Sequence, residues 1–464
     1  MFSTILKREF LDQLLSPKFL IVFLLCIVLV PASLLMNYSS YRNAYLEYDG
    51  AKRVTNKSTV VFREPSALST FGMGLESVLP KQVSFDKYSR EMKGTQAQNE
   101  VLSNITGNID FVVIANFLLG LFAILYACTL MSGEKETGTL KLVLSNQTRR
   151  STLLWGKFLG SYIVLIIPLV VSFLVGLILL LLEKFPLFSG ENLSRIAVVF
   201  VLSLLYLSTL FSLGLLISTR TQRTSVALLA GFLIWITITF VVPKTSEPLA
   251  NLIHPVKSGE AMERNRVTVR NQIEREKSKV LAPLRDKYMK SSDGHRTAWD
   301  FDAYRKERAP LAQEYEERIN KALQDFDAQY EREKATALNL SLNIARLSPA
   351  SAFTHAALDF CRTGVVDREN FLRSLDVHAA QLYKAVFSHT YQDMFDFDEN
   401  GQPHSRHGGD TEENPQFVYP EYRYKFLSFG DTLSRTAPDI VLLVIFNLIF
   451  FAAAYYSFTR YDVR

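Results

Sequence analysis

Few residues in this chain have the types and spacing that catalytic or nucleotide-binding chemistry requires. Gly156 and Lys157 are adjacent, as in the phosphate-binding loop G-x-x-x-x-G-K-[ST], but Phe158 follows them and opens an apolar run. His404 and His407 could bind a metal ion, yet they lie in a glycine-rich segment without a close third ligand. No H-E-x-x-H, C-x-x-C or G-x-S-x-G pattern occurs. We therefore expect no catalytic, cofactor-binding or metal site in this chain, and no enzymatic activity of its own.

The charged residues that remain of interest lie in a polar stretch between two apolar runs, residues 131–160. This stretch is much longer than a turn between two membrane helices requires. Glu134 and Glu136 lie near its start, where acidic side chains suit a helix N-terminus, and Arg149 and Arg150 lie in a later polar turn. An apolar side is supplied by Leu140, Leu142, Val143 and Leu144. The pattern predicts a helical element, which could be simply an amphipathic helix that lies on the inner leaflet.

Windows without Asp, Glu, Lys or Arg indicate the elements that must hold this stretch. Each window is long enough, or nearly so for the first, to cross a hydrocarbon core of about 30 Å as a helix. The first run has no convincing cleavage site and is expected to remain as a span. The sequence therefore predicts an all-α polytopic membrane protein with six transmembrane helices, at residues 19–36, 111–131, 158–182, 196–219, 224–242 and 439–459.

Basic residues near the short loops predict the orientation of the spans. Loops 132–157 and 220–223 are rich in Lys and Arg, whereas loop 183–195 has as many acidic as basic residues. The positive-inside rule then places both termini in the cytosol. Two large segments, 37–110 and 243–438, are left on the outer side. The net charge of +5 follows from this inside excess and does not indicate nucleic-acid binding.

Short segments precede the first span and follow the sixth. Residues 1–18 carry an apolar stripe opposite charged side chains, which predicts an interfacial elbow helix that breaks before Pro17. A membrane-surface anchor without a partner is the alternative for this helix. Residues 460–464 form a cytosolic tail.

The longer outer segment contains two stretches with apolar residues at helical spacing among many charges, at about residues 256–288 and 302–344. A turn-like segment joins them, so they predict an antiparallel helical hairpin in which each helix buries the stripe of the other. Its many charges are interpreted as the solvated face. In the shorter outer segment, Pro and Gly cluster within residues 62–80 and predict turns and short elements.

Short motifs follow one another in an order that resembles ABC-2 type permeases. The polar stretch reads G-E, G-T-L, a segment with Arg and then G-K-x-L-G, as does the cytosolic coupling element of that family. The matching residues are Gly133, Glu134, Gly138, Thr139, Leu140, Arg150, Gly156, Lys157, Leu159 and Gly160. Leu347–Phe353, Arg63–Pro65 and Tyr461–Arg464 resemble a bacterial subfamily with a large periplasmic insert between the fifth and sixth spans.

This resemblance implies the permease subunit of an ABC transporter in the bacterial inner membrane. Such a subunit, expected to belong to an exporter, couples ATP hydrolysis by a separate ATPase to substrate movement across, or extraction from, the membrane. The implied partners are the ABC ATPase with its ATP and Mg, a second permease subunit that is identical or related, the lipid bilayer and a periplasmic partner of the insert, with no nucleic acid. The implied ATPase-coupling residues are Glu134, Glu136, Gly138, Thr139, Arg149, Arg150 and Gly156, with Arg220 and Arg223 as a secondary cytosolic contact.

Two other classes of protein are weighed against the permease. A membrane-anchored sensor or interaction protein would work through its periplasmic helical domain and move no substrate. An intramembrane enzyme would need paired acids or metal ligands in its spans, which these windows lack. The same lack of ionisable residues argues against an ion-coupled carrier, so a transporter of this sequence would take its energy from a partner.

Overall fold

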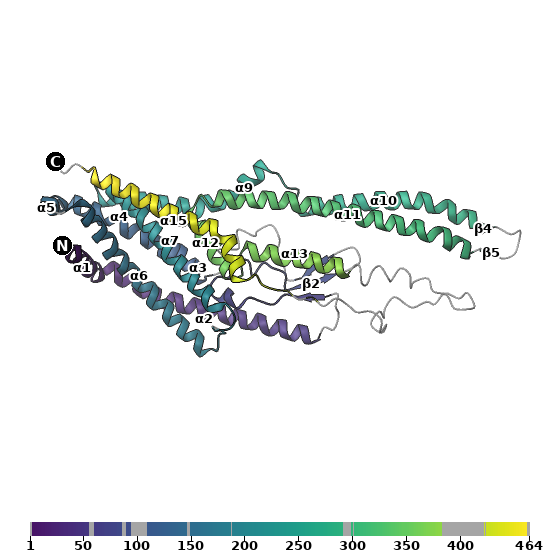
Figure 1. The fold of residues 1–464 in the computed structure, drawn as a ribbon, viewed down its shortest axis with the longest axis horizontal. Coiled ribbons are helices and arrows are strands. Elements are labelled where there is room, and N and C mark those ends of the chain that lie inside the picture. The colour runs from purple at the N-terminus through teal and green to yellow at the C-terminus, as the bar shows by residue number, and fades with distance from the viewer. Residues whose placement is uncertain are drawn as a thin grey trace. The chain divides into compact units, whose positions relative to one another are not determined.

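The computed structural model describes residues 2–54, 60–85, 90–93, 109–145, 149–186, 188–290, 298–299, 301–382, 422 and 424–461 (Figure 1). The chain divides into two compact units. The first combines Met1–Val242 with Arg346–Arg464, and the second is Pro243–Ala345.

The first unit is a helical bundle built from apolar helices. Its helices are α1 (Phe2–Leu14), α2 (Pro17–Val54), α3 (Phe111–Val113), α4 (Gly120–Glu136), α5 (Thr139–Ser145), α6 (Arg150–Leu182), α7 (Asn192–Arg220), α8 (Thr224–Ile236), α12 (Pro349–Phe360), α13 (Val365–Leu382) and α15 (Phe429–Thr459). The π-helical turns η4 (Ile114–Leu119) and η5 (Thr237–Val241) continue α3 into α4 and α8 into α9 (Val242–Ile253).

Six helical segments in the described part of the chain are long and apolar enough to cross a membrane. They are Pro17–Arg53, Phe111–Glu136, Arg150–Leu182, Asn192–Arg220, Thr224–Ile253 and Phe429–Thr459. These segments confirm the predicted fold class, an all-α polytopic membrane protein with six spans. The domain boundaries and the side of the membrane on which each loop lies stay predictions.

The segments α4 and α7 form the centre of the bundle. α4 packs against α7 and α8, α15 packs against α7, and α2 packs against α6. Tyr206 and Phe211 of α7 are wholly buried, whereas α15 fully buries few of its apolar side chains and leaves several, such as Leu448 and Ile449, exposed. An exposed apolar helix face is expected in a membrane protein, because lipid chains and neighbouring helices cover it.

The first helix after the elbow is longer than its apolar run. α1 ends at Leu14 and α2 begins at Pro17, as the proline predicts. α2 then continues to Val54, beyond the predicted end of the first span at residue 36, because no proline interrupts the polar residues that follow.

Short strands follow α2 in the first outer segment. β1 (Val60–Phe62), β2 (Gln82–Phe85) and β3 (Arg90–Lys93) form an antiparallel sheet in the order β1-β2-β3, with the 3-10 turn η1 (Ala67–Thr70) between the first two strands. The segment therefore contains the turns and short elements that its Pro and Gly residues predict.

The second unit is a long helical hairpin. It contains α10 (Gly259–Tyr288) and α11 (Phe301–Ala345), with the two-residue strands β4 (Met289–Lys290) and β5 (Ala298–Trp299) at their junction. The helices are antiparallel, because Lys287 lies 3.0 Å from Glu307 while Lys277 lies 2.8 Å from Glu316.

Apolar side chains fill the seam of the hairpin. Ile319 and Ala312 of α11 are almost fully buried, as is Leu284 of α10. Val267 and Val280, which the sequence pattern places in the stripe of α10, are exposed instead. The spacing of apolar residues identifies the side of α10 that faces α11. It does not show how wide a strip of that side α11 covers, and Val267 and Val280 lie outside the covered strip.

Candidate functional site

The polar stretch lies at the end of the bundle that carries both termini (Figure 1). It does not form one helix. α4 continues to Glu136, and Gly138 ends it in the left-handed region with a φ of 75°, which glycine adopts without strain. The short helix α5 follows, and α6 begins at Arg150. We call residues 137–149, between α4 and α6, the coupling turn.

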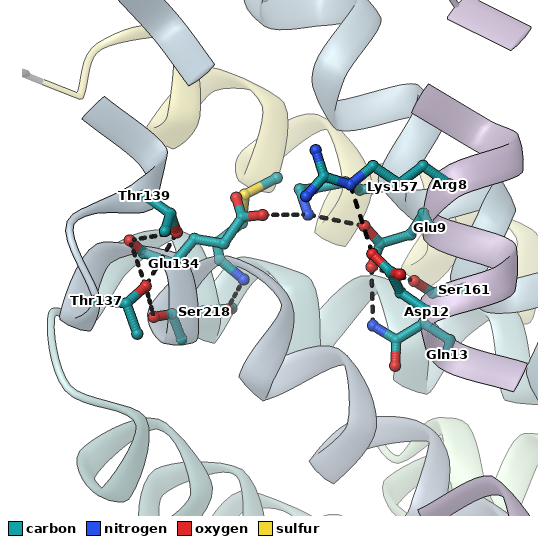
Figure 2. Close-up of polar contacts among 12 residues, drawn as sticks. Arg8, Glu9, Asp12, Gln13, Glu134, Thr137, Thr139, Lys157, Ser161 and Ser218 are labelled. Carbon is teal, nitrogen blue, oxygen red and sulfur yellow. Dashed lines mark hydrogen bonds and ion pairs between the residues drawn. The ribbon is translucent and has the colours of Figure 1, made fainter. Parts of the chain in front are cut away.

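Lys157 of α6 lies at the centre of a buried ion-pair cluster beside the coupling turn (Figure 2). Its ammonium is 2.8 Å from a carboxylate oxygen of Glu134 and 2.9 Å from one of Glu9. The Lys157 side chain is only 6% exposed. One buried cation thus joins three elements, namely α1, the end of α4 and the start of α6.

The Glu9 carboxylate has further donors in this cluster. Gln13 donates to it at 2.8 Å and Ser161 at 3.2 Å (Figure 2). Burial alone would raise the pKa of Glu9, but the ammonium of Lys157 and these hydrogen bonds hold the pKa below its ordinary value. Glu9 is therefore an anion at neutral pH, and the pair with Lys157 is a charged one.

Two glycines of α6 allow α1 to approach closely. A Cβ atom on Gly156 would lie 2.8 Å from Ile5 Cγ2, and one on Gly160 would lie 3.0 Å from the carbonyl oxygen of Leu6. The first distance would force the Ile5 side chain to move, and the second is tighter than most Cβ contacts and would push the two helices apart slightly. The glycines of the G-K-x-L-G motif therefore serve the contact between the elbow helix and the third span.

The last turn of α4 is also joined to the loop between α7 and α8. The Lys135 ammonium donates to the carbonyl oxygens of Ser218, Thr219 and Thr221 at 2.6–3.2 Å, where α7 ends. A cation at this position satisfies carbonyl groups that the helix leaves free and interacts favourably with its dipole. Glu136 accepts from the backbone N–H of Thr224 at 2.9 Å, at the start of α8.

Arg150 joins the coupling turn to the C-terminal helix. Its guanidinium donates to the carbonyl oxygens of Thr459 and Tyr461, at 2.6 and 2.8 Å, where α15 ends. The ring of Tyr461 also lies beneath the ammonium of Lys135, 4.7 Å from its centroid. The tyrosine of the closing Y-D-V-R motif is thus part of this site, whereas residues 462–464 lie outside the described residues.

One face of α5 is exposed among the residues that the structure describes. Leu140 is buried against the core, but Leu142 is 70% exposed and Lys141 is exposed beside it. Thr139 is exposed too, and its hydroxyl lies 2.9 Å from that of Thr137. Arg149 is exposed at the end of the turn.

The structure brings most of the sequence-predicted residues to this one end of the bundle, in different roles. Glu134, Glu136 and Arg150 bind groups of the chain itself, and Gly156 packs against α1. Thr139 and Arg149, together with Arg220 and Arg223 in the other short loop, are exposed. Whether any of them binds an ATPase stays a prediction. His404 and His407 lie outside the described residues.

Three residues of the site were missed from sequence: Glu9, Lys135 and Lys157 in its role as the central cation. Glu9 appeared only as part of the polar side of an amphipathic helix. The one available signal was the spacing of charges, since a lysine next to an apolar run, as Lys157 is, must find a partner when its helix is buried.

The described residues thus include six candidate spans and a charged turn at the end of the bundle where both termini lie. A comparison with protein families agrees with this arrangement. A family model described as ABC-2 family transporter protein matches residues 3–463. No curated protein shows a significant match to the chain. Because the family model covers nearly the whole sequence, the chain belongs to the ABC-2 family of transporter proteins.

Proposed function

We propose that this permease subunit works in an exporter and that α5 docks on a separate ABC ATPase in the cytosol. The observation that carries the proposal is the contrast within the coupling turn. The residues on either side of it, Lys135, Glu136 and Arg150, bind the ends of neighbouring helices, whereas Lys141 and Leu142 within it are exposed. A large exposed apolar side chain next to a lysine fits a protein surface better than it fits water. ATP and Mg bind to the partner, and this chain supplies no catalytic group.

The polar contacts around the coupling turn supply a route for movement. A displacement of α5 is transmitted through Glu134 to α6 and α1, through Lys135 to α7, through Glu136 to α8 and through Arg150 to α15. Packed helices move as rigid bodies, so a shift at their common end changes how they pack along their length. The proposal therefore gives the turn a mechanical role, in which ATP-driven closure of the ATPase repacks the spans.

The proposal includes a second permease subunit, identical or related, and a cytosolic position for both termini. The exposed apolar faces of α8 and α15 support the second subunit, because another membrane helix could pack against them in place of lipid. Substrate then moves across, or leaves, the inner membrane at the expense of ATP bound elsewhere.

The docking surface is tested by the Leu142→Asp variant. Affinity purification of the wild-type permease from its own membranes should bring an ATPase with it, and Leu142→Asp should reduce the amount recovered at least tenfold, which corresponds to about 1.4 kcal/mol. The control is Ser278→Asp, which adds the same charge at an exposed position of the hairpin. Equal recovery of the ATPase with Leu142→Asp would remove α5 from the interface. The absence of any ATPase with the wild-type chain would overturn the proposed function.

A further inference from the structure

The motif Leu347–Phe353 has no part in the coupling site and lies at the beginning of α12. Ser348 is the N-cap of this helix, and its hydroxyl accepts from the backbone N–H groups of Ala350 and Ser351 at 3.1 and 3.4 Å. Pro349 occupies the first helical position, where its missing N–H is not needed. Local helix formation therefore accounts for the order Ser-Pro, but not for the burial of residues 348–353 beside the spans.

The second and fifth spans each contain a π-helical turn, and the two turns lie side by side. In η4 the N–H of Gly120 donates to Ala115, and in η5 the N–H of Val242 donates to Thr237. Phe117 and Phe240 bring the turns together, with ring centroids 5.0 Å apart. A π turn holds one residue more than an α turn and is less stable, so it persists where other contacts hold it.

The π turn of the fifth span leaves the Ile238 carbonyl without a helical donor. In an α-helix this carbonyl would accept from Val242, but the Val242 N–H is directed to Thr237. In a π-helix the donor would come from residue 243, which is proline and has no N–H. The hydroxyl of Ser348 donates to the Ile238 carbonyl instead.

The same helix also contacts the π turn of the second span. The Asn116 side chain donates to the Thr354 hydroxyl at 3.0 Å and accepts from the Tyr206 hydroxyl at 2.7 Å. Phe353 stacks on the Tyr206 ring, with centroids 4.6 Å apart and the planes 8° from parallel. Ser348, Phe353 and Tyr206 are fully buried. α12 is therefore bonded to both π turns from one side (Figure 1 shows its place beside α7 and α15).

We propose that Ser348 is a positioning residue that holds the fifth span in its π-turn form, and that releasing its hydroxyl from Ile238 lets the span rotate. Without Ser348, the Ile238 carbonyl can accept from the N–H of Val242, which converts the π turn to an α turn; the Thr239 carbonyl still lacks an α-helical donor, because Pro243 has no N–H. One residue of an α-helix corresponds to about 100° of rotation, so the helical turns on the two sides of η5 rotate by that amount relative to each other. Two discrete hydrogen-bond patterns make this a two-state element.

Trp235 reports on the state of η5. Its ring lies 5.5 Å from that of Phe240 and is 7% exposed. The chain has three tryptophans, so Trp155→Phe and Trp299→Phe leave Trp235 as the single tryptophan of the permease, and comparing variants with the same ATPase isolates its emission. The experiment measures Trp235 emission in the full-length permease, with its copurified ATPase, in lipid nanodiscs. It is made without nucleotide and after trapping with ATP and vanadate.

Two substitutions remove the Ser348 hydroxyl, and two control substitutions keep its hydrogen bond to the Ile238 carbonyl, which we call the latch. Ser348→Ala and Ser348→Gly cannot donate to Ile238, and glycine retains most of the N-cap stability, which separates the latch from the folding of α12. Ser348→Thr retains the hydroxyl. Ser351→Ala removes a buried hydroxyl from the same turn that has no partner among the described residues.

We expect trapping to shift Trp235 emission in the wild type, Ser348→Thr and Ser351→Ala. Ser348→Ala and Ser348→Gly should show the shifted emission without nucleotide and lose the further change on trapping. Wild-type emission in both of these variants, or a wild-type complex that hydrolyses ATP without any shift, would overturn the latch. The measurement after trapping with vanadate depends on the proposed function. The proposed function is tested independently, because it is wrong if no ATPase copurifies. In that case, emission of the nucleotide-free variants still decides whether Ser348 holds η5.

Discussion

The ammonium of Lys157 lies 2.9 Å from the carboxylate of Glu9, although the two residues are 148 positions apart in the chain. This contact holds α1 against the third span. The same ammonium binds Glu134 at the end of the second span, so a single cation holds two carboxylates from different helices. A displacement of the coupling turn therefore acts on the pair formed by α1 and α6.

Lys157→Met should destabilise the protein strongly. The substitution removes the cation and leaves two carboxylates with little exposure, and breaking a buried pair in this way costs about 3–5 kcal/mol. Thermal unfolding of the purified permease in detergent measures the effect. Arg8→Met is the matched control, because the Arg8 and Asp12 side chains are 80% and 65% exposed and such a pair contributes about 0–1 kcal/mol. Similar melting temperatures for the two variants would contradict the cluster.

Gly160→Ala should move α1 away from α6. The new methyl group would meet the backbone of Leu6 at 3.0 Å and Glu9 Cβ at 3.1 Å, and overpacking of this kind costs about 1–3 kcal/mol. Gly133→Ala places the same methyl in open space on α4 and should be neutral or slightly stabilising. Thermal unfolding of the two variants in detergent measures the effect, and the melting temperature should fall with Gly160→Ala alone. An unchanged melting temperature would show that the glycine is not needed for the approach.

The orientation of the spans can be tested by cysteine labelling. Ser145 and Gln222 lie in the two basic loops and should react, as cysteines, with an impermeant reagent only from the cytosolic side. Ser278→Cys in the hairpin should react only from the opposite side. All three positions are exposed, and the natural residues Cys26, Cys128 and Cys361 are buried and should stay unlabelled. Labelling of position 278 from the cytosol would overturn the predicted topology.

The spans could be predicted from sequence because charge is excluded from them over long windows. The partners of individual charges could not. Glu134 was expected to face an ATPase, since a sequence shows its neighbours along the chain but not Lys157, which packs beside it through the fold. The π turn at Ile238 was hidden for the same reason, although Pro243 carries a signal: a proline in an apolar span leaves a carbonyl that something else must satisfy.

A buried acid in α12 predicts how stability depends on pH. Burial raises the pKa of Asp359 to about 8, and the neighbouring charges of Asp439, Asp367 and Glu369 act in the same direction against one hydrogen bond from the Val366 N–H. The ordinary value is 3.8, so between about pH 4 and 8 the folded protein binds a proton that the unfolded chain does not. Stability from this group therefore falls as the pH rises through that window.

Asp359→Asn should remove this dependence, because the amide resembles the protonated carboxyl at every pH. Melting temperatures of the wild type and the variant in detergent should converge near pH 4 and separate towards pH 8, with the variant more stable at the upper end. Glu331→Gln, at an exposed acid on α11, controls for the general loss of a negative charge. If the wild type and Asp359→Asn lose stability in parallel as the pH rises, Asp359 is ionised in the folded protein, and the hydrogen bond from α13 outweighs the cost of its burial.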